Sequence, residues 1–225
     1  MNQLIQLDRY RQAAPQLYDA LREQIVTLQL KPGDVLSRTE IARQFGVSQT
    51  PVRDALMKLE QEDLVDVFPQ AATRVSKINL RSAQQAHFLR LSVELELVHR
   101  FAIQQNERVN LELKAIMSDL KRCAKGKDSL GFIQADRQFH HVLYEYADLM
   151  EIWALIQGRS GHIDRLRHLH LPADGKMQQI IKDHQDITDA ILSGRPDAAQ
   201  SAVRKHLSGT LAQAEWIKQI HPDYF

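Results

Sequence analysis

Three histidines and one aspartate in the second half of the chain have the residue types and spacing of a metal site. Asp136 and His140 are four residues apart, so on a helix they share one face. His184 and His206 each lie within an apolar stripe of a predicted helix. One carboxylate and three imidazoles are ligands that a divalent transition ion takes in proteins. The alternative is that each imidazole is a hydrogen-bonded residue of an ordinary core.

The positions of His184 and His206 favour a shared ion. Each is 11 residues from Arg195, which lies in a Gly-Arg-Pro break between two predicted helices. An antiparallel pair of helices brings both to the same height, because each residue rises about 1.5 Å along a helix. We therefore predict a site for a divalent transition metal, zinc above all, with nickel and manganese as alternatives. Magnesium and calcium would require more oxygen ligands.

A second group of polar residues lies in the segment GVSQTPVRDALMKL. On a helix, Gln49 and Arg53 fall opposite the apolar residues, in the half where helix-turn-helix proteins contact the major groove. Arginine pairs with guanine and glutamine with adenine through two hydrogen bonds, and a hydroxyl such as that of Ser48 suits a phosphate oxygen. The alternative is a small helical domain with solvated charges. The candidate DNA-binding residues are Arg38, Ser48, Gln49, Thr50, Arg53 and Arg74.

Short elements separated by turn signals must position that helix. Helices are predicted over about 15–28 and 38–45, and a third begins near Pro51, which suits a first helical turn. The segment LVDVFPQAATRVS then predicts two short extended runs about a turn at Pro69-Gln70. Helices followed by a hairpin in this order predict a winged helix-turn-helix.

Only helical periodicity continues beyond Asn79. We therefore expect a mainly α protein with a winged helix-turn-helix domain over 1–76, a linker over 77–81 and an all-helical bundle over 82–225. Breaks, several at Gly or Pro, divide the bundle into predicted helices over 80–105, 109–125, 129–147, 149–170, 175–193 and 196–219.

The composition is that of a globular protein, with 225 residues of which 44% are hydrophobic. The net charge of +1 lacks the basic excess of many nucleic-acid-binding proteins, so any DNA affinity must come from a few placed groups. All ten histidines lie at or after His87, which suggests two segments of different chemistry. A single cysteine, Cys123, and the lack of a long apolar run predict a cytoplasmic protein.

The stretch from Leu36 to Leu64, with SQTPVRDAL at its centre, resembles the DNA-binding domain of the GntR family of bacterial transcription regulators. A core of the type S-R-T-P-V-R-E-A-L is characteristic of that family. The resemblance implies that Arg53 contacts DNA. The chain departs from the family pattern at Gln49, where Arg is usual, at Arg38, where Glu is common, and at Ala71-Ala72, where the wing often has Arg-Gly.

Residues 80–219 resemble the effector domain of the FadR-type branch of the same family. Many members hold a metal through D-x₃-H followed by two further histidines, which Asp136, His140, His184 and His206 match. The resemblance implies a small carboxylate or sugar-acid-like effector beside the metal, bound by an arginine of an R-x₃-E pattern. Arginines later in the chain are further candidates, because a guanidinium binds a carboxylate through two parallel hydrogen bonds. The alternative is that these arginines form an exposed basic face of a helix. The candidate effector-binding residues are Arg90, Glu94, His162, Arg165 and Arg167.

These patterns predict a ligand-responsive repressor without catalytic residues, acting as a homodimer on double-stranded operator DNA. One alternative is a metal-dependent hydrolase fused to a nucleic-acid-binding module, because an ion in a helical bundle also activates water. A DNA-associated structural protein is another, and it would not respond to a ligand. P-loop, HExxH, G-x-S-x-G and GxGxxG motifs are not found in the sequence.

Overall fold

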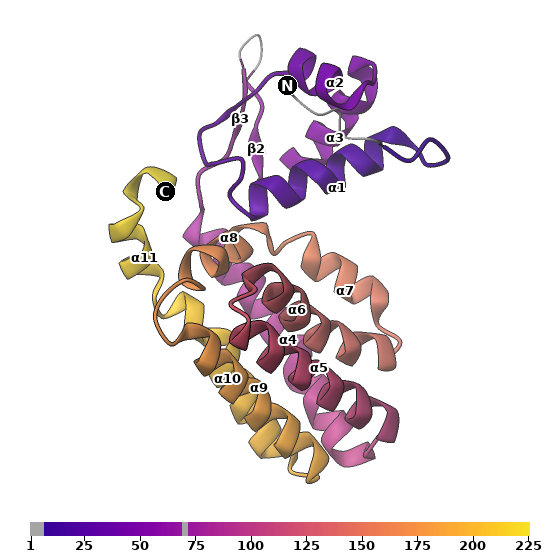
Figure 1. Ribbon diagram of the computed structural model, residues 1–225, viewed down its shortest axis with the longest axis vertical. Coiled ribbons are helices and arrows are strands. Elements are labelled where there is room, and N and C mark those ends of the chain that lie inside the picture. The colour runs from indigo at the N-terminus through magenta and orange to yellow at the C-terminus, as the bar shows by residue number, and fades with distance from the viewer. Residues whose placement is uncertain (1–6, 69–71) are drawn as a thin grey trace.

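The computed structural model describes residues 7–68 and 72–225, which form an N-terminal unit with a small sheet and a larger helical unit (Figure 1). The three strands of the N-terminal unit form an antiparallel sheet in the order β1-β3-β2. Its elements are α1 (Ala13–Val26), β1 (Val35–Leu36), α2 (Arg38–Phe45), α3 (Gln49–Gln61), β2 (Val65–Asp66) and β3 (Thr73–Val75).

Local signals account for most of these elements. The Ser37 hydroxyl accepts the backbone N–H of Glu40 at the start of α2, and Gly46 ends that helix in the left-handed conformation at φ 65°. α2 therefore spans the predicted residues. β1 was not predicted, because a two-residue strand is too short to show alternation and exists only by pairing with β3. The predicted turn at Pro69-Gln70, with Ala71 of the wing, lies outside the described residues.

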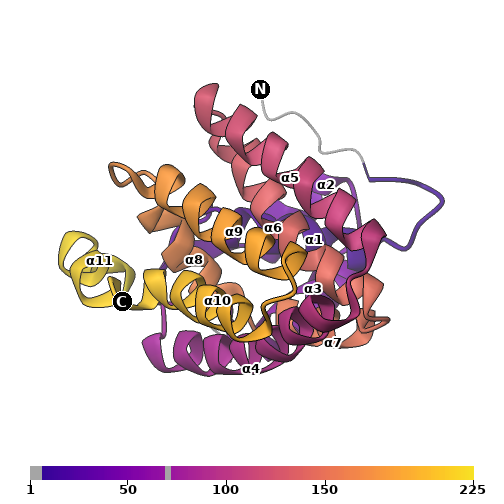
Figure 2. The ribbon, with the colours of Figure 1, turned by 90° about the horizontal axis from the view of Figure 1, so that it is seen from below.

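The helical unit packs its long helices around one core, and Figure 2 shows α10 lying between α4 and α9. Its elements are α4 (Leu80–Gln104), α5 (Glu107–Lys125), α6 (Ser129–Tyr146), α7 (Met150–Gln157), α8 (Gly161–His170), α9 (Lys176–Leu192), α10 (Pro196–Leu211), α11 (Ala214–Ile220) and the 3₁₀ turn Pro222–Tyr224. The fold class is therefore as predicted, a small winged unit followed by an all-helical bundle.

Two predicted helices are each divided in the structure. The prediction over 149–170 is wrong at its centre, where Gly158-Arg159-Ser160 separates α7 from α8. Gly161 lies against Leu64 of the N-terminal unit, and a Cβ there would come within 2.5 Å of the Leu64 side chain. The helix therefore breaks where the two units meet. The prediction over 196–219 is likewise wrong, because α10 ends at Leu211, where the sequence has neither glycine nor proline.

Hydrogen bonds from the helical unit hold the connecting segment, residues 76–79. The Arg165 guanidinium is fully buried and donates to the carbonyl of Ser76 at 2.7 Å. The amide of Asn79 donates to His162 Nδ1 at 3.0 Å, and the amide of Ile78 donates to the carbonyl of Tyr224 at 2.7 Å. Backbone groups of this segment are therefore bound by α8 and by the C-terminal turn, which restricts how the two units can move.

His162 and Arg165, two of the predicted effector-binding residues, lie at the junction of the two units. Arg165 Nη2 donates to His162 Nδ1 at 2.8 Å, so both side chains are used at the junction of the units. Burial, together with the charge of Arg165, lowers the pKa of His162 to about 3, which keeps the imidazole a neutral acceptor. Burial also lowers the pKa of Arg165 to about 10. These two residues fasten the connecting segment.

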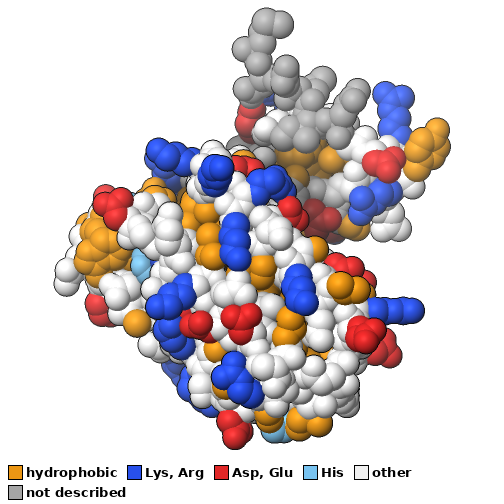
Figure 3. Space-filling model, turned by 60° about the horizontal axis from the view of Figure 1, so that its bottom comes forward, with side chains coloured by type: hydrophobic (Ala, Val, Ile, Leu, Met, Phe, Trp, Pro, Cys, Tyr) orange, Lys and Arg blue, Asp and Glu red, His pale blue; other side chains and the backbone are white. Residues whose placement is uncertain are grey.

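The surface carries charges of both signs. On the face seen in Figure 3, basic and acidic side chains are interspersed over the described residues, in keeping with the net charge of +1. None of the helices within residues 7–68 and 72–225 has the length and apolar character needed to cross a lipid bilayer.

Candidate functional site

The four predicted metal ligands converge within the helical unit. α6 supplies Asp136 and His140, α9 supplies His184 and α10 supplies His206. One potential ligand atom from each residue lies within 4.8 Å of the other three. His140 Nε2 and His206 Nε2 are 3.2 Å apart, and His184 Nε2 is 3.5 Å from Asp136 Oδ1. The α9-α10 hairpin thus brings His184 and His206 to one height, with ring centroids 4.3 Å apart.

Partners on the outer side of the rings orient the histidines. His184 Nδ1 donates to the carbonyl of Ile180 at 2.9 Å, and His140 Nδ1 donates to Glu94 Oε2 at 2.7 Å. His206 Nδ1 lies 4.0 Å from Asp183 Oδ2. Since the Nδ1 protons of His184 and His140 are engaged in this way, their Nε2 lone pairs face the shared centre, which is the arrangement of metal-binding histidines.

The residues present fit a divalent transition ion. His184 Nε2 is buried and has no hydrogen-bond partner among the described residues, so its lone pair is left unsatisfied in the protein alone. Burial lowers the pKa of His184 to about 4 and that of His206 well below its usual value, so both rings are neutral. Burial raises the pKa of Asp136, but the positive electrostatic environment of the cluster, which includes the guanidiniums of Arg167 and Arg90, outweighs burial and lowers it, so the carboxyl is ionised. One carboxylate and three imidazoles match zinc ligation.

A cavity of about 320 Å³ adjoins this cluster, and Asp136 and His206 form part of its wall. Five lysine or arginine side chains line it against three aspartates or glutamates, so its charge favours an organic anion. Trp153 and Phe132 provide apolar surface. The charged lining residues are Arg22, Arg90, Arg137, Arg167 and Lys176, with Glu23, Asp136 and Asp164.

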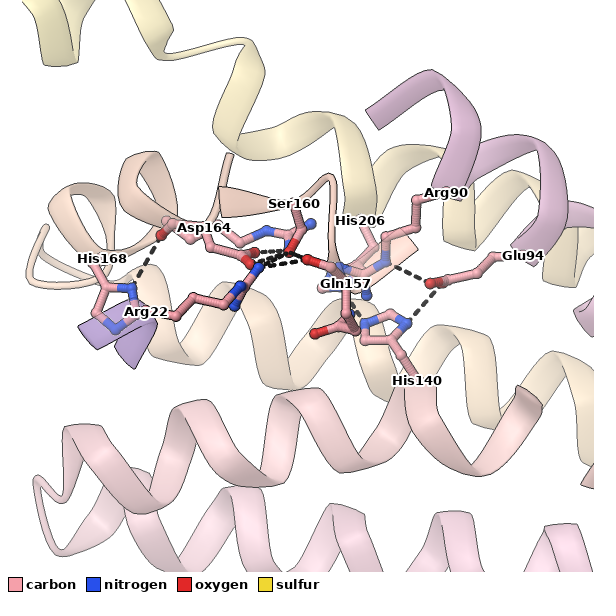
Figure 4. A network of polar contacts seen from close by, with 10 residues as sticks. Arg22, Arg90, Glu94, His140, Gln157, Ser160, Asp164, His168 and His206 are labelled. Atoms are coloured by element: carbon pink, nitrogen blue, oxygen red, sulfur yellow. Dashed lines mark hydrogen bonds and ion pairs between the residues drawn. The ribbon is translucent and has the colours of Figure 1, made fainter. Parts of the chain in front are cut away.

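Arg90 and Arg167 line this cavity, and Glu94 pairs with Arg90 (Figure 4 shows Arg90 and Glu94). Arg90 Nε pairs with Glu94 Oε1 at 2.5 Å, and Glu94 also accepts from His140, so one carboxylate joins the cavity to the cluster. Burial raises the pKa of Glu94, but the charges of Arg90 and His140 dominate and lower it to about 2. Burial and the charge of Arg90 lower the pKa of Arg167, which lines the same cavity as Arg90.

Several lining and supporting residues had no signal in the sequence. Asp183 is buried beside His206, Trp153 lies in the cavity wall, and Asp164 pairs with Arg167 at 2.9 Å. Arg22 reaches the same cavity from α1 of the N-terminal unit. None of them belongs to a spaced motif, because each comes from a different helix and only the packing of helices brings them together.

Glu94→Gln should weaken zinc binding by about 10–100-fold, because a ligand histidine loses its charged outer partner. Glutamine keeps the size of the side chain and one acceptor oxygen, so the fold should persist. Competition with a zinc-binding dye measures the affinity. Glu96→Gln is the matched control, since Glu96 is exposed on the same helix. Equal zinc affinities of the Glu94 variant and the wild type would exclude Glu94 as a supporting residue.

The candidate DNA-binding residues are all exposed in the N-terminal unit. Gln49 and Arg53 lie on α3 opposite its buried face, which consists of Val52, Ala55, Leu56 and Leu59. Ser48 stands at the N-cap, and within the described residues its hydroxyl accepts no helix N–H, which leaves it available to a phosphate. Arg53 pairs with Asp54 at the long distance of 3.4 Å, and Arg74 on β3 donates to the carbonyl of Gly33.

Both units match known protein families. Residues 85–209 match the FCD domain, and residues 13–75 match the bacterial regulatory proteins of the gntR family. The chain belongs to the GntR family. An FCD domain can bind a metal, and the Asp136, His140, His184 and His206 cluster lies within the residues matched here.

The relatives of this GntR regulator are themselves transcription regulators, and the similarity extends over nearly their whole length. An HTH-type regulator from an unstable DNA locus of Streptomyces ambofaciens is 33% identical over 209 residues, 93% of this chain and 88% of that protein. The repressor RspR of Escherichia coli K12 is 28% identical over 220 residues, 98% of this chain and 96% of RspR. The structure of E. coli McbR/YncC, at 20% identity, has the same fold, with a TM-score of 0.77 over 94% of this chain and 99% of that chain. The protein is therefore a bacterial HTH-type transcription regulator.

Proposed function

We propose that this GntR regulator is a repressor that senses a small organic acid or sugar acid beside a bound divalent transition metal, zinc being the best fit. The observation that supports it is the convergence of three histidines and Asp136 at the wall of a cavity with an excess of positive side chains. The proposal treats residues 1–76 and 82–225 as two domains joined by residues 77–81, and the protein as a homodimer and not an enzyme.

Each polar group of the cavity has a task in this proposal. Asp136 and the three histidines would hold the ion, which supplies an open coordination position for an acid oxygen. Arg90 and Arg167 would bind the carboxylate through charge-assisted hydrogen bonds. Glu94 orients Arg90 and His140 together, so the anion site and the ligand cluster are built as one unit.

The response to the acid requires two states of the dimer with different affinities for it. In one state, Arg53 and its neighbours on the two copies of α3 would meet both halves of a two-fold operator. If the acid binds the other state more tightly, it releases the operator. A coupling of about 1–3 kcal/mol changes operator affinity by about 5–150-fold.

Native mass spectrometry of the purified full chain tests the metal and the dimer together. We expect a mass of two chains with one ion per chain. An operator is then selected from random DNA. Added acids should lower the affinity of the zinc-loaded protein for this operator, but not the affinity of protein from which a chelator has removed the zinc. Zinc-dependent hydrolysis of small esters or phosphate esters, with operator binding insensitive to every acid, would instead favour the hydrolase alternative.

A further inference from the structure

The N-terminal unit forms part of the wall of the effector cavity. Arg22, Glu23 and Val26 of α1 line it together with residues of the helical unit. Figure 1 shows α1 lying along the helical unit, between it and α3. A ligand in this cavity therefore meets the same unit that carries the candidate DNA-binding residues.

Arg22 connects the cavity to the end of α3. Its Nε donates to Glu62 Oε2 at 2.8 Å, and its Nη2 donates to the carbonyl of Gln157 at 2.5 Å. Glu62 is the C-cap residue of α3 and also accepts the hydroxyl proton of Tyr18. The side chain of Arg22 is 14% exposed, so this pairing is largely shielded from water. Arg22 thus joins three parts of the chain, namely α1, the end of α3 and the end of α7.

Arg22 also has unused donors and a second acceptor nearby. Its Nη1 makes no hydrogen bond to any described residue, and Nη2 lies 3.5 Å from Ser160 Oγ. The hydroxyl of Ser160 donates to Asp164, which also accepts from Arg167 at 2.9 Å. Figure 4 shows Arg22, Ser160 and Asp164 pointing toward one another. An anion held by Arg167 would compete with Asp164 for that guanidinium.

We propose that Arg22 is an effector-binding residue, contributed by the DNA-binding unit, which receives the second acidic group of a dicarboxylic or aldaric acid. This rests on the proposed function, in which the first acidic group binds beside the metal. A guanidinium binds a carboxylate best through two parallel N–H groups. Arg22 therefore turns toward the ligand at the expense of its bond to Glu62, which frees the C-terminal end of α3.

The proposal predicts opposite effects from the two partners of this ion pair. Removing the guanidinium takes away a ligand contact and weakens binding of a dicarboxylate. Removing the charge of Glu62 weakens its hold on Arg22 and makes the guanidinium more available, so binding becomes tighter. Acetate has a single carboxylate, which binds at the metal end, so neither change affects it. A residue that only supports the fold would not produce opposite signs.

The test uses the full chain loaded with zinc, and acetate, succinate, glutarate and adipate as probes in calorimetric titrations. Arg22→Gln should weaken the best-bound dicarboxylate by about 10-fold or more, the loss expected for one charged hydrogen bond, and acetate by less than about 2-fold. Glu62→Gln should tighten the same dicarboxylate by about 2–10-fold. Arg43→Gln is the control, since Arg43 is exposed on α2 and pairs with Glu40 of the same helix.

Each outcome decides one question. Equal dicarboxylate affinities of Arg22→Gln and the wild type, or equal losses for acetate and dicarboxylates, would overturn the role of Arg22 while the acid site stands. Weaker dicarboxylate binding by Glu62→Gln would do the same, because it would assign the ion pair to folding alone. If none of the four acids binds the zinc-loaded wild type, a site for simple carboxylates, and with it the role of Arg22, is refuted. Circular dichroism checks that both variants are folded.

Discussion

Replacing His184 and His206 together by alanine should abolish stoichiometric zinc binding. The two rings come from α9 and α10. His206 Nε2 lies 3.2 Å from His140 Nε2, and His184 Nε2 lies 3.5 Å from Asp136 Oδ1. With both removed, one imidazole and one carboxylate of α6 remain, too few for a protein zinc site. Elemental analysis should find about one zinc per wild-type chain and almost none per variant chain after both are dialysed against the same zinc solution.

Thermal unfolding supplies a second measure of the same substitution. At a free zinc concentration about 1,000 times Kd, binding to the folded state stabilises it by about 4 kcal/mol, or about 8–16 °C in Tm for a chain of this length. We expect that zinc-dependent shift in the wild type and its loss in the variant. His141→Ala is the control, because His141 follows His140 but lies beside Glu145 and Trp153. Full zinc retention by the double variant would refute the site.

Arg53→Ala should weaken binding to the selected operator by about 1–3 kcal/mol at each half-site, because a two-pronged contact to a base is lost. If two copies of α3 bind a two-fold operator, the losses combine to about 2–6 kcal/mol, at least about 30-fold in Kd. Arg53 is exposed, and its only partner in the described residues is Asp54 at 3.4 Å, so its removal should leave the fold intact.

The control variant Arg43→Ala distinguishes the loss of a contact to a base from the loss of a positive charge. Both substitutions remove one exposed positive charge from the N-terminal unit, but Arg43 lies on α2 and is paired with Glu40. Fluorescence anisotropy with the selected operator and with unrelated DNA should show a loss of specificity for Arg53→Ala alone. Equal losses for both variants on both DNAs would mean that Arg53 acts only through charge.

Much of the fold could be read from local patterns, because capping residues, glycines and apolar periodicity act within a few residues of one another. Ser37 and Gly46 delimit α2, and the Gly-Arg-Pro break between α9 and α10 places His184 opposite His206. The break between α7 and α8 was missed, although two glycines lie there. Gly161, at the start of α8, lies against Leu64, a contact between units that no local pattern contains.

The candidate site divides in the same way. The four candidate metal ligands could be named beforehand, since each occupies an inward position of a periodic helix and two of them share a helical turn of α6. The arginines could not be assigned, because a guanidinium looks alike in sequence whether it binds a ligand or a backbone carbonyl. Arg167 lines the cavity, whereas Arg165, two residues away, is buried against the connecting segment.

The sequence by itself therefore determined the family, the order of elements and the set of groups able to hold a metal, all of which depend on residue type and spacing. The tertiary structure alone decided which charged groups share one cavity, and it placed Arg22 of the DNA-binding unit among them. The physical reason is that hydrogen bonds and ion pairs act over a few ångströms. Arg22 and Gln157 are 135 residues apart in sequence, and only the packing of α1 on the helical unit brings them into contact.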